Sequence, residues 1–173
     1  MQNYEVTHCV AGDLSESELE ACAEIITAGE AVDPEWARVQ LPLAISIAVA
    51  RLAEEVVGVG AIKQVRPGYA SSIAARSEFA FSADTPELGY VAVAERHRRL
   101  GLSHRILTCL TDDREGALFA TTDDANMKKA LLAAGFAERG KGGPDNGDRY
   151  RFGLESRPER MFSVFVRYPR CLQ

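Results

Sequence analysis

The apolar and polar residues of this chain recur with two different periods, which predict short strands and helices. Residues 4–10 (YEVTHCV) alternate and are rich in residues that favour strands, so they predict a first strand. Residues 15–29 predict a helix, because apolar residues recur there at helical spacing. Ser15 is a candidate N-cap with Glu18 three positions later, and Gly29 is placed to end the helix.

The middle of the chain holds strand candidates on both sides of a segment without a clear period. Residues 34–40 (PEWARVQ) predict a short helix, and residues 44–53 and 56–65 predict two strands joined at a pair of glutamates. Residues 66–86 carry turn signals at both ends, and their periodicity decides nothing. Residues 87–94 (ELGYVAVA) predict another strand.

The C-terminal half alternates between helical and strand patterns. The predicted elements are helices at 103–113 and 123–136, a short buried strand at 117–122, a loop at 140–148, and strands at 149–154 (RYRFGL) and 161–166 (MFSVFV). The last strand has an alternative role as an edge strand of a homodimer. Strands followed by alternating strands and helices predict an α/β fold with a mixed sheet and helices on both faces.

Length and composition describe an ordinary globular protein. With 173 residues the chain is expected to form one domain over 1–173 with a substantial core. No apolar run approaches the roughly 20 residues that a membrane span needs, and the N-terminus lacks a signal-peptide layout. We therefore expect a cytoplasmic protein without a membrane partner. The net charge of −5 argues against a general nucleic-acid binder.

The four cysteines are scattered and do not form a metal-binding or disulfide pattern. We expect no metal site and reduced thiols that lie mostly in the core. Cys109 falls in the middle of a predicted helix, so a structural role is expected for it rather than a nucleophilic one.

One strand-to-helix corner concentrates positive charge in this acidic chain. Residues 94–107 (AERHRRLGLSHRIL) contain four arginines and two histidines around Gly101. The first turn of a helix has N–H groups without partners and the positive end of the helix dipole. A glycine lets the backbone approach a ligand closely, and arginines beside it favour an anion such as a phosphate or pyrophosphate. The corner therefore predicts an anion-binding loop.

The loop lacks the GxxxxGK[ST] pattern of a P-loop and the GxGxxG pattern of a dinucleotide-binding turn. Residues 98–103 read R-x-x-G-x-S directly after ELGYVAV, which resembles the Q/R-x-x-G-x-G/A loop of the GNAT superfamily of acyl-CoA-dependent N-acetyltransferases. Ser103 departs from that pattern but keeps a small side chain. The order of the flanking elements resembles the family over residues 43–155, and most closely over 86–136.

The resemblance implies a mostly antiparallel sheet of about six to seven strands and acetyl-CoA as the co-substrate. It implies that the pantetheine arm pairs with the backbone of residues 91–93, and that the pyrophosphate lies on N–H groups of 99–103 with Arg98 and Arg99 beside it. The cofactor-binding residues expected on this basis are Val91, Ala92, Val93, Arg98, Arg99, Leu100, Gly101, Leu102 and Ser103. Asp124 or Asn126 either contacts the pantetheine arm or caps the following helix. Arg96 and Arg105 are expected at the surface, and His97 and His104 outside the chemistry.

Amine acetylation needs a base, because an alkylamine is mostly protonated at neutral pH. Glu87 is the first candidate, since the family places a glutamate near this strand start, and simple alternation puts it on one face with Gly89, Val91 and Val93. The alternative is an ordinary carboxylate in water, and Glu78 and Asp84 are weaker competitors. The family's usual tyrosine proton donor corresponds to Leu131 here. Tyr150 or Tyr90 is a substitute, or the thiolate leaves without an acid.

These features predict an N-acetyltransferase that moves an acetyl group to a primary amine by direct transfer in a ternary complex. The expected partner is a small-molecule amine. Two alternatives stay open: acetylation of a macromolecule, such as a protein lysine or an aminoacyl-tRNA, and an acyl-CoA-binding module without turnover.

Overall fold

The computed structural model describes residues 2–29, 32–65, 68–77, 80–144 and 161–168. Within these ranges it has seven strands in the order β1-β2-β3-β4-β5-β7-β6, and five α-helices. The β4–β5 pair is parallel, and the β1–β2, β2–β3, β5–β7 and β6–β7 pairs are antiparallel. The prediction of a mixed, mostly antiparallel sheet is confirmed.

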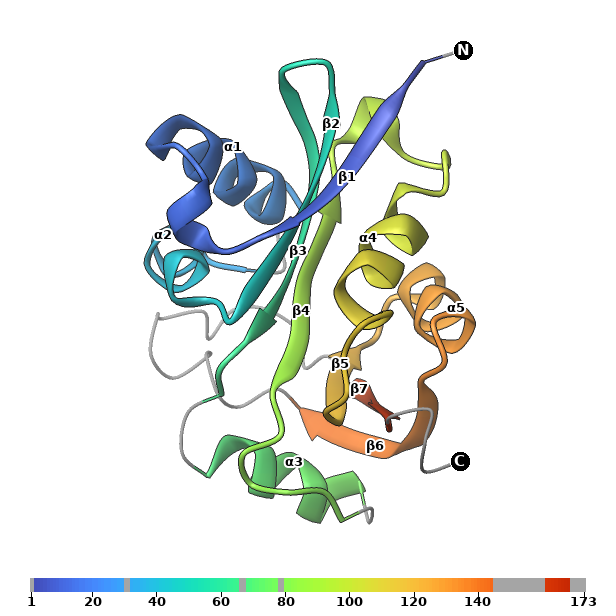
Figure 1. Cartoon of the computed structure of the whole chain (residues 1–173). Coiled ribbons are helices and arrows are strands. Elements are labelled where there is room, and N and C mark those ends of the chain that lie inside the picture. Colours follow the sequence, from blue (N-terminus) through green and yellow to red (C-terminus); the bar gives the residue numbers. More distant parts are fainter. Residues whose placement is uncertain (1, 30–31, 66–67, 78–79, 145–160, 169–173) are drawn as a thin grey trace. The chain divides into compact units, whose positions relative to one another are not determined.

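The chain divides into two compact units, Met1–Gln64 with Leu88–Arg114, and Val65–Glu87 with Glu115–Gln173. The first unit contains β1 (Tyr4–Cys9), α1 (Glu16–Thr27), α2 (Pro34–Gln40), β2 (Ser46–Leu52), β3 (Glu55–Lys63), β4 (Glu87–Val93) except for Glu87, and α4 (Leu102–Thr111). In this unit α1 and α2 cover one face of the sheet, and α4 covers the other (Figure 1).

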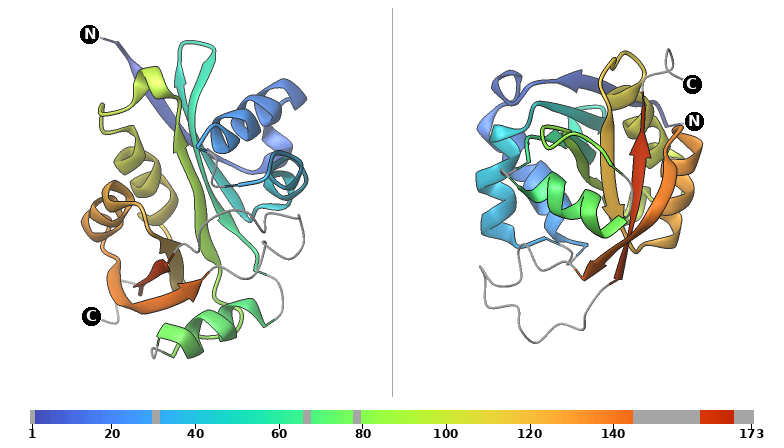
Figure 2. Two further views of the ribbon diagram at one scale, coloured as in Figure 1. Left: turned by 180° about the vertical axis from the view of Figure 1, so that it is seen from behind. Right: turned by 90° about the horizontal axis from the view of Figure 1, so that it is seen from below.

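The second unit contains α3 (Tyr69–Ser77), β5 (Leu118–Thr122), α5 (Ala125–Ala133), β6 (Ala137–Pro144) and β7 (Met161–Arg167). Figure 2 shows α3 and α5 on opposite sides of β6. Phe119 of β5 is fully buried and stacks on Phe81, with ring centroids 5.0 Å apart. No helix among the described residues is long and apolar enough to cross a membrane.

The predicted start of α1 is confirmed. The Ser15 hydroxyl accepts a hydrogen bond from the Glu18 N–H at 3.2 Å, and the Glu18 carboxylate accepts one from the Ser15 N–H at 3.0 Å. This reciprocal pair satisfies backbone donors that a helix start leaves open. Glu18 also pairs with Arg51 of β2 at 2.7 Å, which fixes the helix to the sheet.

The two faces of β3 pack against helices in different ways. Val59 and Ala61 join a buried cluster with Cys22 and Ile26 of α1. On the other face, a Cβ placed on Gly60 would lie 2.5 Å from the Ile106 Cγ2 atom of α4. The absence of a side chain at this position is therefore what lets α4 approach the sheet so closely.

Helix α3 lies in the segment whose periodicity decided nothing. Its buried positions are Ala70, Ile73 and Ser77, which follow helical spacing. Two of these three side chains are small, so their burial leaves little hydrophobic contrast in the sequence.

The predicted loop at 140–148 is partly wrong, because β6 extends through Pro144. Glycine and lysine are depleted in strands, so the sequence of this segment did not predict β6. Its pairing with β7 shifts register on both sides of Lys141, and Gly140 adopts φ +94°. Strand β7 lies between β5 and β6, so the role of residues 161–166 as an edge strand is also wrong. The predicted strand at 149–154 lies outside the described residues.

The close approach of α4 gives a first prediction. Gly60→Ala should destabilise the protein by about 1–3 kcal/mol, because the β-branched Ile106 side chain has little freedom to move away from the added methyl group. Urea unfolding measures the change. Gly12→Ala is the matched control, since a Cβ there has no atom within 4 Å, and an equal loss in both variants would contradict the packing argument.

The capping pair gives a second prediction. The Ser15 N–H and the Arg51 guanidinium lower the pKa of Glu18 from 4.5 to about 2. A depressed pKa stabilises the fold above the unfolded value, and this stability is lost as pH falls through the folded value. Glu18→Gln should therefore lower the free energy of unfolding at pH 7 by about 1 kcal/mol, and the gap should close as pH falls from 4.5 toward 2.

Urea unfolding at several pH values measures this gap. Glu24→Gln, on an exposed position of the same helix, is the control and should show no comparable dependence on pH. A Glu18→Gln deficit that stays constant down to pH 2 would assign the effect to packing instead of charge.

Candidate functional site

Strand β4 contains a bulge that the sequence pattern did not predict. Tyr90 has φ +55°, a value that non-glycine residues adopt rarely. A Cβ on Gly89 would lie 2.8 Å from Lys63 Cε, and the Lys63 ammonium lies 4.5 Å from the centre of the Tyr90 ring. Two consecutive residues of β4 thus face the same side chain, which together with the positive φ of Tyr90 indicates a bulge.

The bulge overturns the alternation expected for β4. Tyr90 and Ala92 pack against the cluster on the α1 side of the sheet. Val91 points the other way, with its Cγ2 atom 3.3 Å from the position of a Cβ on Gly60, where α4 packs. The expectation that Gly89 shares one face with Val91 and Val93 is wrong. A glycine inside a strand is the signal that would have indicated this bulge.

The end of β4 holds the backbone in a defined position before the loop. The Ala94 N–H donates to the Val57 carbonyl at 2.9 Å, and the Arg98 Nε donates to the Val93 carbonyl at 3.1 Å. Val91 and Ala92 are half-buried. Their contact with a pantetheine arm stays a prediction.

The predicted anion-binding loop is a tight turn that leads directly into α4. A short 3-10 turn, Glu95–His97, follows β4. Arg99 and Gly101 then adopt positive φ angles of +64° and +75°. Gly101 is the N-cap of α4, which begins at Leu102, one residue before the predicted start.

The loop presents a row of backbone donors. Among the described residues, the structure gives no hydrogen-bond acceptor to the backbone N–H groups of residues 99–104. The helical bonds of α4 begin with the Arg105 N–H, which donates to the Gly101 carbonyl at 3.1 Å. Consecutive free N–H groups at a left-handed turn and a helix N-terminus form a concavity for an anion. The loop therefore fits the phosphates of a nucleotide-like ligand.

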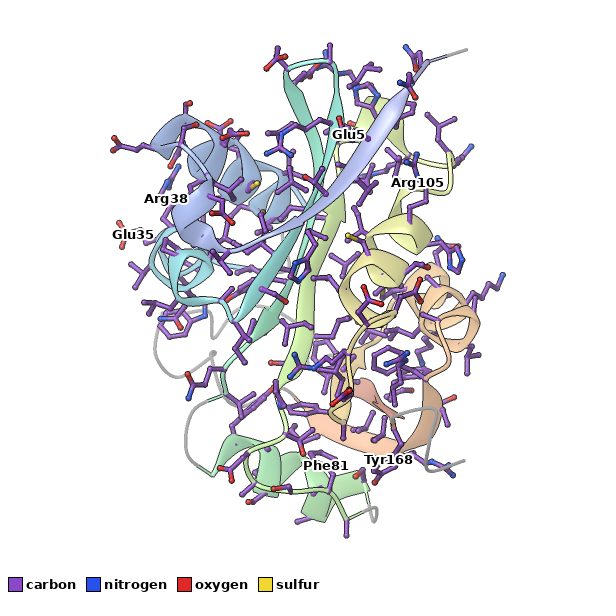
Figure 3. The ribbon with its side chains drawn as sticks, in the orientation of Figure 1. Glu5, Glu35, Arg38, Phe81, Arg105 and Tyr168 are labelled. Carbon is purple, nitrogen blue, oxygen red and sulfur yellow. The ribbon has the colours of Figure 1, made fainter. Side chains whose placement is uncertain are left out.

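The side chains of the loop have different roles. Leu102 is buried and anchors the helix start, whereas Arg99 is exposed. Arg96 forms an ion pair with Glu55, and Arg105, which Figure 3 labels, donates to the Tyr4 carbonyl at 2.8 Å. The two arginines expected outside the binding chemistry therefore have other partners.

The start of α5, in the second unit, is capped by Asp124. Its carboxylate accepts a hydrogen bond from the Met127 N–H at 2.7 Å, and Asn126 is exposed in the first turn. Capping accounts for Asp124, and a contact of either residue with pantetheine stays a prediction. Leu131 on the same helix is 1% exposed, so it is a core residue.

Glu87 lies in the second unit at the start of β4. It is opposite Phe119 in the register with β5 and is 8% exposed. The Thr121 hydroxyl donates to its carboxylate at 3.3 Å. The alternative of an ordinary carboxylate in water is therefore wrong. Its competitor Asp84 is exposed, and Glu78 and Tyr150 lie outside the described residues.

The thiols do not have the character of nucleophiles. Burial raises the pKa of Cys109, and it raises the pKa of Cys22 to about 12. Thiolate is the reactive form, so both residues are poor nucleophiles near neutral pH. Among the described residues, no group of three or more His, Cys, Asp or Glu is arranged to hold a metal ion.

No protein-family model matches the sequence, and no curated protein matches it. Solved structures do match. An IAA acetyltransferase from Bacillus cereus is 14% identical, with a TM-score of 0.63 over 95% of this chain and 99% of that one. The putative acetyltransferase yncA from Salmonella typhimurium, solved with acetyl-CoA, is 17% identical, with a TM-score of 0.64 over 95% and 92%.

A GNAT family acetyltransferase from Elizabethkingia anophelis, solved with acetyl-CoA bound, is 14% identical, with a TM-score of 0.60 over 97% of this chain and 99% of that one. At such identities the similarity concerns the fold. The chain has the fold of the GNAT acetyltransferases, and the resemblance seen in the sequence is confirmed at this level.

Proposed function

We propose that this protein transfers an acetyl group from acetyl-CoA to a primary amine, directly and within a ternary complex. The observation that carries the proposal is the row of free N–H groups at residues 99–104, beside Arg98 and Arg99. Two proteins with the same fold were solved with acetyl-CoA, which supports this choice of anion.

The loop suits a pyrophosphate because its donors belong to the backbone. Backbone N–H groups at a helix start bind phosphate oxygens without a conformational change, and the helix dipole adds favourable charge. Arg99 is exposed next to them and can reach a phosphate, whereas Arg98 also holds the Val93 carbonyl. The loop is thereby positioned and positively charged before the ligand arrives.

Glu87 is the proposed base. An amine near neutral pH is mostly protonated, so one proton must leave before its nitrogen attacks. In the transfer, the nitrogen forms a bond to the thioester carbonyl carbon, the C–S bond breaks, and its electron pair stays on sulfur. The carboxylate of Glu87 receives the first amine proton, directly or through water, while the Thr121 hydroxyl holds the carboxylate in place. The second proton leaves the nitrogen after it has bonded to the carbonyl carbon, and passes to solvent water or to the departing thiolate.

The leaving thiolate needs no acid from α5. Leu131 is buried in the core and has no proton to give. A thiol with a pKa of about 8.5 leaves readily as a thiolate, which makes direct transfer compatible with this residue. The same leucine is the observation that favours the second candidate, an acyl-CoA-binding module without turnover.

The anion-binding loop gives the test of the proposal. Acetyl-CoA at about 100 times its dissociation constant should stabilise the folded protein by about 2.7 kcal/mol and raise the melting temperature by several degrees. Gly101→Glu should abolish this shift, because it puts a negative charge beside the pyrophosphate. Thermal unfolding at constant salt measures both.

Gly101→Gln is the matched control. Both variants place a side chain at φ +75°, where a Cβ meets no atom within 4 Å, so both carry the same backbone strain of about 1–2 kcal/mol. A larger loss of binding in Gly101→Glu isolates the charge. If the unsubstituted protein shows no shift, acetyl-CoA is not the ligand and the proposal fails.

A panel of primary amines with thiol detection then tests turnover. Glu87→Gln should lower kcat by about 10²–10⁴-fold, because general-base catalysis contributes this much, and it should leave acetyl-CoA binding unchanged. Asp84→Asn, which changes an exposed carboxylate shortly before Glu87 in the chain, is the control and should retain activity. Binding without thiol release for any amine, protein lysine or aminoacyl-tRNA would establish the binding module instead.

A further inference from the structure

His97 lies immediately before the anion-binding loop, and its side chain is 6% exposed. Its Nδ1 atom is 2.9 Å from the Tyr4 hydroxyl of β1, and its Nε2 atom is 3.0 Å from the Nε of Arg96. The rings of His97 and Tyr4 meet edge to face, with centroids 5.7 Å apart. A residue expected to be a bystander is thus buried with both ring nitrogens engaged.

The donor capacity of these groups determines where the proton lies. A guanidinium only donates hydrogen bonds, so the Nε2 of His97 must accept from Arg96. The ring is then neutral with its proton on Nδ1, which donates to the oxygen of Tyr4. The Tyr4 hydroxyl in turn donates to the Gln2 Oε1 atom at 2.5 Å.

These bonds connect β1 to both ends of the loop. On one side, His97 is the last residue of the 3-10 turn that precedes Arg98. On the other, Arg105 of α4 donates to the Tyr4 carbonyl at 2.8 Å. The free N–H groups of residues 99–104 lie between these two attachments to a single residue of β1.

We propose that His97 is a positioning residue for the anion-binding loop and that it acts only as the neutral Nδ1–H tautomer. A second proton would place an N–H donor and a positive charge against the Arg96 guanidinium, so the contact would be lost and the loop would lose one attachment. Acetyl-CoA should therefore bind more weakly in acid. This inference rests on the proposed function in taking acetyl-CoA as the ligand of the loop.

The charges around His97 determine in which direction acetyl-CoA affinity should change with pH if the residue acts by positioning. Arg96 contacts the ring, Glu55 of β3 pairs with Arg96, and Arg105 of α4 and the phenol of Tyr4 lie on the β1 side. A histidinium acting through its charge alone would attract the pyrophosphate and tighten binding in acid. Positioning predicts the opposite, a weaker binding of acetyl-CoA when the His97 ring carries a second proton.

The test is the dissociation constant of acetyl-CoA at pH 8 and pH 5.5, at constant ionic strength. All proteins carry His104→Gln, because His104 is a second histidine, exposed in the first turn of α4 beside the loop. The comparison is with His97→Gln, whose side chain cannot be protonated. Titration of the ligand phosphates affects both proteins equally, so it does not contribute to the difference between them. The protein with His97 should lose about tenfold more affinity in acid than the variant. An equal loss, or tighter binding with His97, would overturn the inference.

A second readout does not depend on acetyl-CoA. Nitrogen NMR of the histidine rings at pH 8 should show His97 with its proton on Nδ1, and acidification should shift the amide signals of residues 99–103 unless His97 is replaced by glutamine. A proton on Nε2, or loop amides that do not follow His97, would overturn the inference. Absence of acetyl-CoA binding at pH 8 would instead overturn the proposed function, and the NMR result would still decide the role of His97.

Discussion

The candidate site depends on how closely α4 approaches β3. Ile106 of the helix occupies the space that a Cβ on Gly60 would need, and it would lie 3.1 Å from a Cβ on Gly58. Helix α4, held at this distance, begins at Leu102 after the loop that follows β4, and its first N–H groups are unpaired. A bulkier pair of residues in β3 would move the helix away, and the loop between Val93 and Leu102 would have to follow it.

The arginines of the corner have more structural partners than the sequence suggests. Arg96 pairs with Glu55, while Arg98 and Arg105 donate to the carbonyls of Val93 and Tyr4. Three of the four arginines therefore fix the shape of the corner. The positive field of the corner comes from Arg98, Arg99 and Arg105, which keep their charge, and from the backbone donors of the helix start. Anion binding by this corner stays a prediction, and the structure gives three of the four arginines a partner that holds the loop.

Much of the fold follows from periodicity and capping signals. The capping pair of Ser15 and Glu18, the alternation in β1 and the apolar runs of β2 and β3 identified the first half of the first unit. Helix α3 was not predicted, because two of its three buried positions are the small residues Ala70 and Ser77. Strand β6 was not predicted, because its pairing with β7 includes glycines and register shifts that no strand pattern predicts. In each case tertiary contacts decided a segment that has weak local preferences.

In the candidate site, too, features set by local sequence could be predicted, whereas features set by tertiary contacts could not. Gly101 and the helix after it could be predicted, since a glycine before a helix start has a defined conformational meaning. The bulge at Tyr90 could not be derived from alternation, because it is stabilised by Lys63 from another strand. The contact between His97 and Tyr4 likewise could not be predicted, since Tyr4 is distant in the sequence and only the fold brings the two rings together.

A binding loop made of backbone donors also explains how sequence and fold can diverge. Its N–H groups are supplied by any residue that accepts the local dihedral angles, so only positions such as Gly101 are restricted. The surrounding core needs apolar volume more than particular residues. Chains with 14–17% identity can therefore share this fold over almost their whole length, while no family model matches the sequence. We therefore expect what distinguishes this protein to lie in individual side chains, such as those of His97 and Glu87 in their proposed roles.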